Sequence, residues 1–352
     1  LALGRYVDAV QIARGGMGAV LRAEDPDLER TVAIKVQLAG RRARPESVTR
    51  FLREARITGQ LEHPNIPPVH ELAKTPDGRW YFSMKLVEGR TLAEELRRRG
   101  ELPRSRRPEA TLRLLGVILK VCDALRYAHS RGVFHRDLKP ANIMIGEFGE
   151  VLVMDWGIAK VRGDRSTRIA RPRPADAHDT DAILTQAGDV LGTPAYMSPE
   201  QSAGEQAWID ARSDVYTLGV ILYEIVTGSL PYAGVTFQEM RSLVCIGRPE
   251  LPSRRAPDER IPRELDAAIL RAMAVEPEDR YQRVEDLQAD LEAYLQGNTL
   301  RAARYTLLER ALKWVRRNRA VSAVATVATV GLLVLSAAFV WRLDAERQRK
   351  RV

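Results

Sequence analysis

The stretch that decides how this chain is interpreted reads His135-Arg136-Asp137-Leu138-Lys139-Pro140-Ala141-Asn142. It places a carboxylate, an amine and an amide within eight residues. A second carboxylate, Asp155, follows thirteen residues after Asn142, at the end of the hydrophobic run 151–154. Carboxylate and amide oxygens suit a hard cation, and an amine neutralises phosphate charge. The two segments together predict a centre for phosphoryl chemistry.

Length and composition allow one large domain or two small ones. The chain has 352 residues, of which 45% are apolar, so a sizeable core can form. Its two cysteines, Cys122 and Cys245, match no disulfide framework and no metal-ligand spacing. The net charge of +9 favours an anionic partner. We expect no nucleic acid, because zinc-finger spacing and RNA-binding aromatic signatures are missing from the sequence.

Residues 320–341 are uncharged and mostly Val, Ala and Leu, with Trp314 before the run and Trp341 at its end. A helix of ~22 residues is roughly 33 Å long, enough to span a bilayer core of about 30 Å. The alternative is a buried core helix. The chain starts at Leu1 and stops soon after this run, so we expect a fragment of a longer protein whose post-membrane segment begins at 342–352.

Two further segments carry phosphate-binding chemistry. Three glycines, Gly15, Gly16 and Gly18, let backbone N–H groups approach a polyphosphate, although a glycine hairpin turn is the alternative. The β-branched run 31–36 predicts a strand that carries Lys35. A helix is expected over 50–61, with Glu54 on it, and a strand over 80–84.

Together these segments resemble the protein kinase family. The loop 135–142 is similar to the kinase catalytic loop, and Asp155-Trp156-Gly157 to the metal-binding Asp-Phe-Gly. The glycine segment resembles the kinase glycine-rich loop with Ala13 in place of the first glycine, and Val32-Ala33-Ile34-Lys35 resembles the strand with the phosphate lysine. Residues 192–200 resemble Gly-Thr-x-x-Tyr-x-Ala-Pro-Glu, with Ser198 in place of Ala. The whole pattern looks most like bacterial, membrane-anchored Ser/Thr kinases.

The resemblance implies an α+β, two-lobed fold over residues 6–295. The small β-rich lobe with one helix would cover about 6–87, and the helical lobe about 88–295. A basic juxtamembrane helix would follow over 296–319 and a transmembrane helix over 320–341, with an ordinary linker helix as the alternative for the former. The arginine-rich stretch 91–107 is expected to be a solvated basic face, or else a lipid contact.

The resemblance also implies the roles of individual residues. Catalysis would rest on Asp137, Lys139, Lys35 and Glu54, and the metal ligands would be Asn142 and Asp155. The nucleotide would contact Ile12, Gly15, Gly16, Gly18, Val20, Ala33, Lys35, Met84, Lys85 and Val87. The activation segment would be controlled by phosphorylation at Ser166, Thr167, Thr180 or Thr185, with Thr185 the preferred site. Thr193 of the same segment would contact Asp137 and Lys139. Structural roles are expected for Asp214, Glu200 and Arg280.

The implied activity is transfer of the γ-phosphoryl group of ATP to protein Ser/Thr hydroxyls. Its cofactors would be ATP and Mg²⁺, with Mn²⁺ as an alternative ion. The chain would be a single-pass membrane protein with a cytoplasmic kinase domain, and small residues in the span allow a homodimer. One alternative is a pseudokinase that acts as a binding module, supported by Ala13 and Trp156. The other is a small-molecule kinase, against which the docking segment 193–200 argues.

Overall fold

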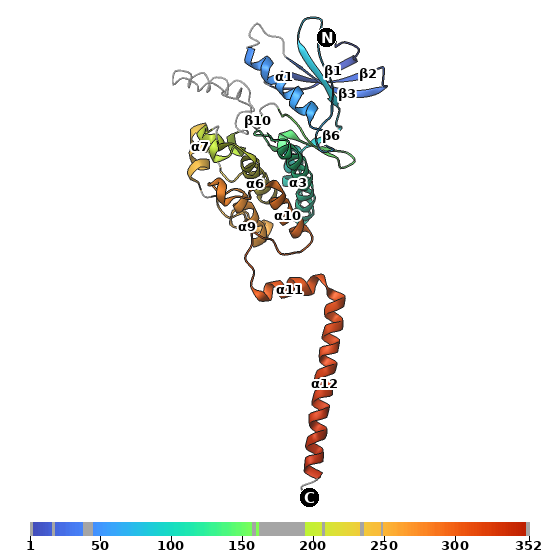
Figure 1. Ribbon diagram of the computed structural model, residues 1–352, viewed down its shortest axis with the longest axis vertical. Helices are drawn as coiled ribbons and strands as arrows, with labels where there is room; N and C mark the ends of the chain where they lie inside the picture. The colour runs from blue at the N-terminus through green and yellow to red at the C-terminus, as the bar shows by residue number, and fades with distance from the viewer. Residues whose placement is uncertain are drawn as a thin grey trace.

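Two lobes and a long C-terminal helix make up the molecule (Figure 1). The structure is a computed structural model that describes residues 3–15, 18–37, 45–156, 160–161, 194–205, 208–232, 236–247 and 249–349. A strand-rich lobe comes first and a helical lobe second, so the two-lobed α+β fold expected from the sequence is confirmed.

The N-terminal lobe is a five-stranded antiparallel sheet with one long helix beside it. The strand order is β1-β2-β3-β5-β4. The elements are β1 (Val7–Arg14), β2 (Gly18–Asp25), β3 (Arg30–Gln37), β4 (Val69–Lys74), β5 (Trp80–Lys85) and α1 (Pro45–Gln60).

Alternation along β3 decides where its side chains point. Val32 and Ile34 belong to a buried cluster on one face of the sheet. Ala33 belongs to another cluster that includes Phe51 of α1. Successive strand residues point to opposite faces, so Lys35 shares the face of Ala33 and points toward α1.

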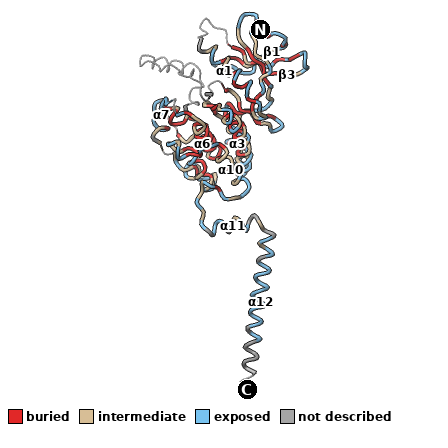
Figure 2. The backbone as a smooth tube through the Cα atoms, viewed as in Figure 1, coloured by how far each residue is buried: buried red, intermediate tan, exposed pale blue. Residues whose placement is uncertain are grey.

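The helical lobe is built around α6, which is buried along nearly its whole length. A helix that is apolar on all sides belongs in a core, and α3 and α10 pack against it (Figures 1 and 2). The helices of this lobe are α2 (Leu92–Glu101), α3 (Arg107–Ser130), α5 (Pro199–Ala203), α6 (Ala211–Thr227), α7 (Phe237–Ile246), α8 (Pro252–Arg255), α9 (Arg263–Ala272) and α10 (Val284–Leu295).

Short strands hold the two ends of the loop 135–142. They are β6 (Gly89–Thr91), β8 (Ile143–Gly146) and β9 (Val151–Val153) in one antiparallel sheet, and β7 (Val133–Phe134) with β10 (Lys160–Val161) in another. The loop therefore begins where β7 ends and finishes where β8 begins. Because β9 pairs with β8, Asp155 follows β9 close to Asn142, and the Met154 amide donates to the Asn142 carbonyl at 2.7 Å.

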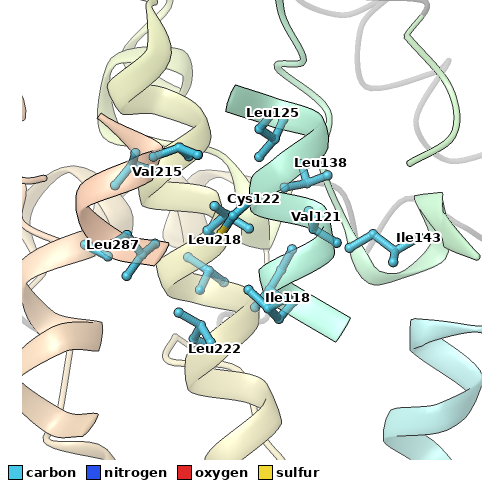
Figure 3. Packing of buried hydrophobic residues seen from close by; sticks show 14 of the residues in the cluster. Ile118, Val121, Cys122, Leu125, Leu138, Ile143, Val215, Leu218, Leu222 and Leu287 are labelled. Atoms are coloured by element: carbon cyan, nitrogen blue, oxygen red, sulfur yellow. The ribbon is translucent and has the colours of Figure 1, made fainter. Parts of the chain in front are cut away.

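Leu138 and Ile143 anchor this loop in the core. Both are buried, and Figure 3 shows them beside Val121 of α3. The same cluster continues through α6 and α10. Buried apolar side chains thus fix the position of the loop that contains the polar residues.

The C-terminal part differs from the sequence expectation of one helix over 296–319. Gly297, with a φ of 72°, follows the end of α10, and a new helix, α11 (Leu307–Arg317), begins only after Thr306. Thr306 and Glu309 form a capping box, which satisfies the first amides of α11 and fixes its start.

Helix α12 (Arg319–Arg349) is the last element. Its segment Val321–Phe339 is long and apolar enough to cross a membrane, and none of it is buried (Figure 2). The predicted span 320–341 lies on this helix.

Arg99 departs from the expected basic face over 91–107. It is only 3% exposed and donates to one carboxylate oxygen of Glu259 at 2.6 Å, while Arg107 donates to the other at 2.8 Å. The expectation was wrong for Arg99, because its partner lies 160 residues away in sequence. The exposed members of the run are Arg97, Arg98, Arg104 and Arg106.

Arg280→Met should strongly destabilise the helical lobe. Arg280 is 1% exposed and donates to both carboxylate oxygens of Glu200, at 2.9 and 2.8 Å. Its removal leaves a buried carboxylate without its cation, which costs about 3–5 kcal/mol of unfolding free energy. Chemical unfolding of the full chain in detergent measures this loss.

The matched control is Arg104→Met, which breaks the exposed Arg104–Asp258 pair. Such surface pairs contribute about 0–1 kcal/mol. Equal losses in the two variants would contradict the role assigned to the Glu200–Arg280 pair.

Candidate active site

A cleft of about 810 Å³ lies between the lobes. Its walls include residues from β1, β2, β3, β5 and α1 above, and from the loop 135–142 and β8 below. The predicted site residues that line it are Gly15, Gly18, Val20, Lys35, Glu54, Met84, Asp137, Lys139, Asn142 and Asp155. The volume and the mixture of apolar and polar walls are typical of a small-molecule site.

Lys35 joins both lobes at the back of the cleft. Its Nζ lies 2.5 Å from Oε1 of Glu54 on α1 and 3.5 Å from Oδ1 of Asp155. β3 aims Lys35 at α1, and Glu54 faces inward because it shares a helix face with Phe51 and Ala55 of the buried cluster. The ammonium is therefore held at a fixed position facing the cleft.

Burial and charge act in opposite directions on this pair. Burial works to lower the pKa of Lys35, but the carboxylates of Asp155 and Glu54 outweigh it and raise that pKa. Burial raises the pKa of Glu54 to about 7, although Lys35 opposes the rise. Lys35 thus stays protonated, and Glu54 is the member of the pair that titrates near neutral pH.

The loop 135–142 gathers its polar side chains at the floor of the cleft. Lys139 Nζ lies 3.2 Å from Oδ2 of Asp137, and Asn142 donates its side-chain N–H to the Asp137 carbonyl at 2.8 Å. That bond uses the amide nitrogen of Asn142. Its amide oxygen is then the atom that suits a cation shared with Asp155.

Asp214 on α6 holds the backbone at the start of this loop. Its carboxylate accepts from the amides of His135 and Arg136, both at 2.9 Å, and contacts His129 Nε2 at 2.8 Å. Burial works to raise the pKa of Asp214, but His129 and the Arg136 amide outweigh it and lower that pKa. The carboxylate is therefore kept ionised inside the protein, as a receptor for backbone amides.

Two residues of the site adopt left-handed backbone conformations. Arg136 has a φ of 70° and Asp155 a φ of 61°. Such conformations are unfavourable for non-glycine residues by roughly 1–2 kcal/mol. Asp214 fixes the amide of Arg136, and Gln201 Nε2 donates to its carbonyl at 2.6 Å. The surrounding contacts hold the strained turn that presents Asp137.

Trp156 takes the place of the phenylalanine of related sites. It is fully buried, packs on His135 with ring centroids 4.7 Å apart, and donates its indole N–H to the Val153 carbonyl at 3.1 Å. The larger ring therefore fits the core, and Asp155 still reaches Lys35.

The segment that ends at Glu200 is tied to the helical lobe. Tyr196 donates its hydroxyl to Glu224 of α6 at 2.6 Å. Ser198 caps α5 in a capping box with Gln201, and Glu200 pairs with Arg280. The serine that replaces the usual alanine thus has a function, because a hydroxyl accepts the free amides of a helix start and a methyl group does not.

Some predicted residues lie elsewhere. Among the described residues predicted to contact the nucleotide, those outside the lining of the cleft are Ile12, Ala33, Lys85 and Val87. Ile12 is exposed on β1, and Ala33 is buried in the cluster that includes Phe82 and Met84. The predictions for Gly16, Ser166, Thr167, Thr180, Thr185 and Thr193 fall outside the described residues.

Other lining residues were missed from the sequence. Met144 and Met154 line the cleft, and so do Phe82 and Tyr196. Met144 follows Asn142 by two residues on an extended segment, and this alternation could have identified it. Tyr196 gave no such signal, because its position depends on its contact with α6.

The sequence is also similar to those of known proteins. Residues 6–291 match the protein kinase domain family. Among curated proteins, the chain is 40% identical over 295 residues to serine/threonine-protein kinase PknB of Mycolicibacterium smegmatis. It is 39% identical over 295 residues to PknB of Mycobacterium tuberculosis and 37% identical over 293 residues to PknD of Protochlamydia amoebophila.

Each of these alignments covers 82% of this chain. They cover 42% of each PknB relative and 30% of the PknD relative. The chain therefore spans less than half the length of these three relatives.

Asp214→Asn should loosen the loop 135–142. Asparagine has one acceptor oxygen, so one of the two loop amides would face an NH₂ donor and lose its partner. We expect faster amide hydrogen exchange in the loop, measured by mass spectrometry. Asp210→Asn, a cap substitution four residues earlier in sequence, is the control. Unchanged exchange in Asp214→Asn would refute the bracing role.

Proposed function

Because this chain belongs to the protein kinase domain family, we propose that it transfers the γ-phosphoryl group of ATP to serine and threonine hydroxyls of proteins. The observation that carries the proposal is the meeting of Lys35, Glu54, Asp155, Asp137 and Asn142 around one cleft. Four of these five residues have charged side chains, and Asn142 has an amide oxygen that can bind a metal ion. Phosphoryl transfer requires both kinds of group.

The walls of the cleft fit a nucleotide. Val20, Met84 and Met144 offer apolar surface to a base, while Lys35 lies toward the phosphates. At Gly18 a Cβ atom would come within 2.5 Å of the Val36 carbonyl oxygen. Only glycine therefore permits this close pairing of the two strands over the cleft.

Asn142 and Asp155 would hold a divalent cation in the cleft. Mg²⁺ prefers oxygen ligands and is usually held by one or two protein groups together with substrate phosphates. Within the described residues, no group of three or more His, Cys, Asp or Glu could hold a metal ion, so a site completed by phosphate oxygens suits this pair. When bound, the ion would neutralise charge on the phosphates, and Mn²⁺ has similar ligand preferences.

The residues of the loop 135–142 then have distinct tasks. The substrate hydroxyl oxygen forms a bond to the γ-phosphorus as the bond from that phosphorus to the β–γ bridging oxygen breaks, and ADP leaves. Asp137 orients the hydroxyl and accepts its proton. Lys139, 3.2 Å from Asp137, neutralises charge on the transferring group. Lys35 holds the remaining phosphates, positioned by Glu54.

Lys139 supports serine and threonine as acceptors, because the sequence Asp-Leu-Lys-Pro-x-Asn resembles that of Ser/Thr kinases, whereas tyrosine kinases usually lack this lysine. The named specificity of the relatives supports the same acceptors. The rival function is a pseudokinase that binds nucleotide without transfer. Its sequence support was Ala13 and Trp156. Trp156 fits the core without displacing Asp155, which favours the enzyme.

Autophosphorylation of the segment between Asp155 and Glu200 is part of the proposal. Arg53 on α1 lies close enough to Arg136 to contribute to the lowering of its pKa, which burial chiefly causes. Two neighbouring guanidinium groups suit a phosphorylated side chain. Thr185 is the preferred acceptor, with Thr180 as an alternative, and Thr193 would contact Asp137 and Lys139.

Membrane tethering through α12 completes the proposal. The apolar segment Val321–Phe339 supports it, and the need for ATP puts the kinase domain on the cytoplasmic side. Pairing of two copies through Ala325, Ala328 and Thr329 in the span remains a prediction.

Asp137→Asn should abolish most transfer, because asparagine cannot accept the hydroxyl proton. The expected loss in kcat is about 10²–10⁴-fold, measured with γ-labelled ATP and the purified full chain. Wild-type protein should also label itself, and phosphopeptide mapping should find Thr185. Glu147→Gln, on the exposed turn after β8, is the control with full activity. Equal incorporation of label in wild type and Asp137→Asn would contradict the proposed transfer and would favour the pseudokinase.

Acidification should weaken Mg-ATP binding by the wild type. With a pKa of about 7, Glu54 is mostly ionised at about pH 8 and mostly protonated at about pH 6, and protonation removes its charge from the contact with Lys35. Glu54→Gln is neutral throughout, so it should show only the pH dependence of ATP itself. Calorimetric titration measures both, and parallel curves for the two proteins would exclude this role of Glu54.

A further inference from the structure

Helix α11 turns its polar face toward the kinase domain. Lys313 Nζ lies 2.7 Å from Oε1 of Glu264 on α9 and donates to the Asn298 carbonyl at 2.9 Å. Glu309 and Lys313 line a cavity of about 420 Å³ together with Glu264 and Arg263. The contacts with the helical lobe that the described side chains of α11 make are thus ionic and polar.

The segment before α11 is clamped to the same lobe. Asp290 of α10 is 1% exposed and accepts from the amides of Arg301 and Ala302, at 2.6 and 2.9 Å. Tyr281 donates its hydroxyl to the same carboxylate at 2.7 Å. Leu300 is also buried. α11 therefore has a defined orientation relative to the domain.

The apolar side of α11 faces away from the domain. Leu308 and Val315, seven residues apart and so on one helix face, are 70% and 44% exposed, and Trp314 is 48% exposed. A surface helix of a soluble domain has the opposite arrangement, with its apolar face on the core. Another apolar medium is needed to cover this face.

The helix that follows indicates which medium that is. α12 begins two residues after α11 ends and runs crosswise to it (Figure 1). A bilayer around Val321–Phe339 would place its surface at the level of α11. Residues 300–319 contain seven basic residues and one acidic residue, which favours anionic headgroups.

We propose that α11 lies flat in the surface of an anionic phospholipid bilayer, with Leu308, Trp314 and Val315 inserted and its polar face bound to the helical lobe. The proposal rests on the membrane span of α12 proposed above. The domain then stands on the membrane with α9 and α10 toward it and the N-terminal lobe at the far end (Figure 1).

Single-cysteine labelling of the full chain tests this arrangement. An environment-sensitive fluorophore is attached at Leu308→Cys or Val315→Cys, in a Cys245→Ser background, since Cys122 is buried. The protein is reconstituted into vesicles of phosphatidylcholine alone or with phosphatidylglycerol. We expect a blue shift, loss of emission with brominated lipids, and a larger effect when phosphatidylglycerol is present.

Two further positions serve as controls. Phe148→Cys, at a side chain that is 97% exposed, should not respond to lipid, and Phe339→Cys in the span should be quenched. If Leu308 and Val315 labels behave like Phe148 while Phe339 is quenched, α12 spans the bilayer and α11 does not lie on it.

Three other outcomes of the labelling experiment would also contradict the proposal. If the Phe339 label is not quenched either, α12 does not span the bilayer, and the proposal for α11, which depends on that span, is wrong as well. Equal quenching with and without phosphatidylglycerol would overturn the anionic surface. A blue shift without lipid quenching would place a protein surface, such as a second copy, on this face and would overturn the bilayer.

Discussion

A single buried carboxylate, that of Asp214, is the constraint on which the site depends. Two consecutive backbone amides point at it, and it is fixed in α6, the most deeply buried helix of the described chain. An ion inside a core is costly unless hydrogen bonds surround it. Here they come from His129 of α3 and from two amides of the loop 135–142. The loop amides stabilise the buried charge, and the charge fixes the conformation of the loop. Asp137 lies in sequence between Arg136, whose amide Asp214 binds, and Leu138, which is buried in the core. Its backbone is therefore fixed on both sides.

The N-terminal lobe contributes by a different kind of interaction. The ammonium of Lys35 contacts Glu54 on α1 and Asp155 of the helical lobe. It therefore connects three segments of the chain that are separate in sequence. Both contacts of the ammonium are ionic. Burial raises the pKa of Glu54 to about 7, although Lys35 opposes the rise. The helical lobe thus holds the loop 135–142 through Asp214 and the core, whereas Lys35 connects the N-terminal lobe to Asp155 through an ionic contact.

Most of the fold followed from local patterns, whereas the departures came from distant partners. The strand that carries Lys35 and the helix that carries Glu54 were predictable, because their alternation or helical spacing lies within a few residues. Arg99 was not, since Glu259 is 160 residues away. The break before α11 depends on Asp290, which accepts from the amides of Arg301 and Ala302, eleven and twelve residues later. Helical spacing alone cannot reveal this contact.

Trp156 has a thermodynamic consequence. In kinases the packing of the residue at this position distinguishes active from inactive arrangements, and phenylalanine is held there by apolar contact alone. Trp156 adds the bond from its indole N–H to the Val153 carbonyl, which must break if the ring leaves. A hydrogen bond contributes about 1 kcal/mol, which changes a two-state population about fivefold. Compared with phenylalanine, Trp156 therefore adds one contact that favours the arrangement in which the ring is buried and Asp155 reaches Lys35.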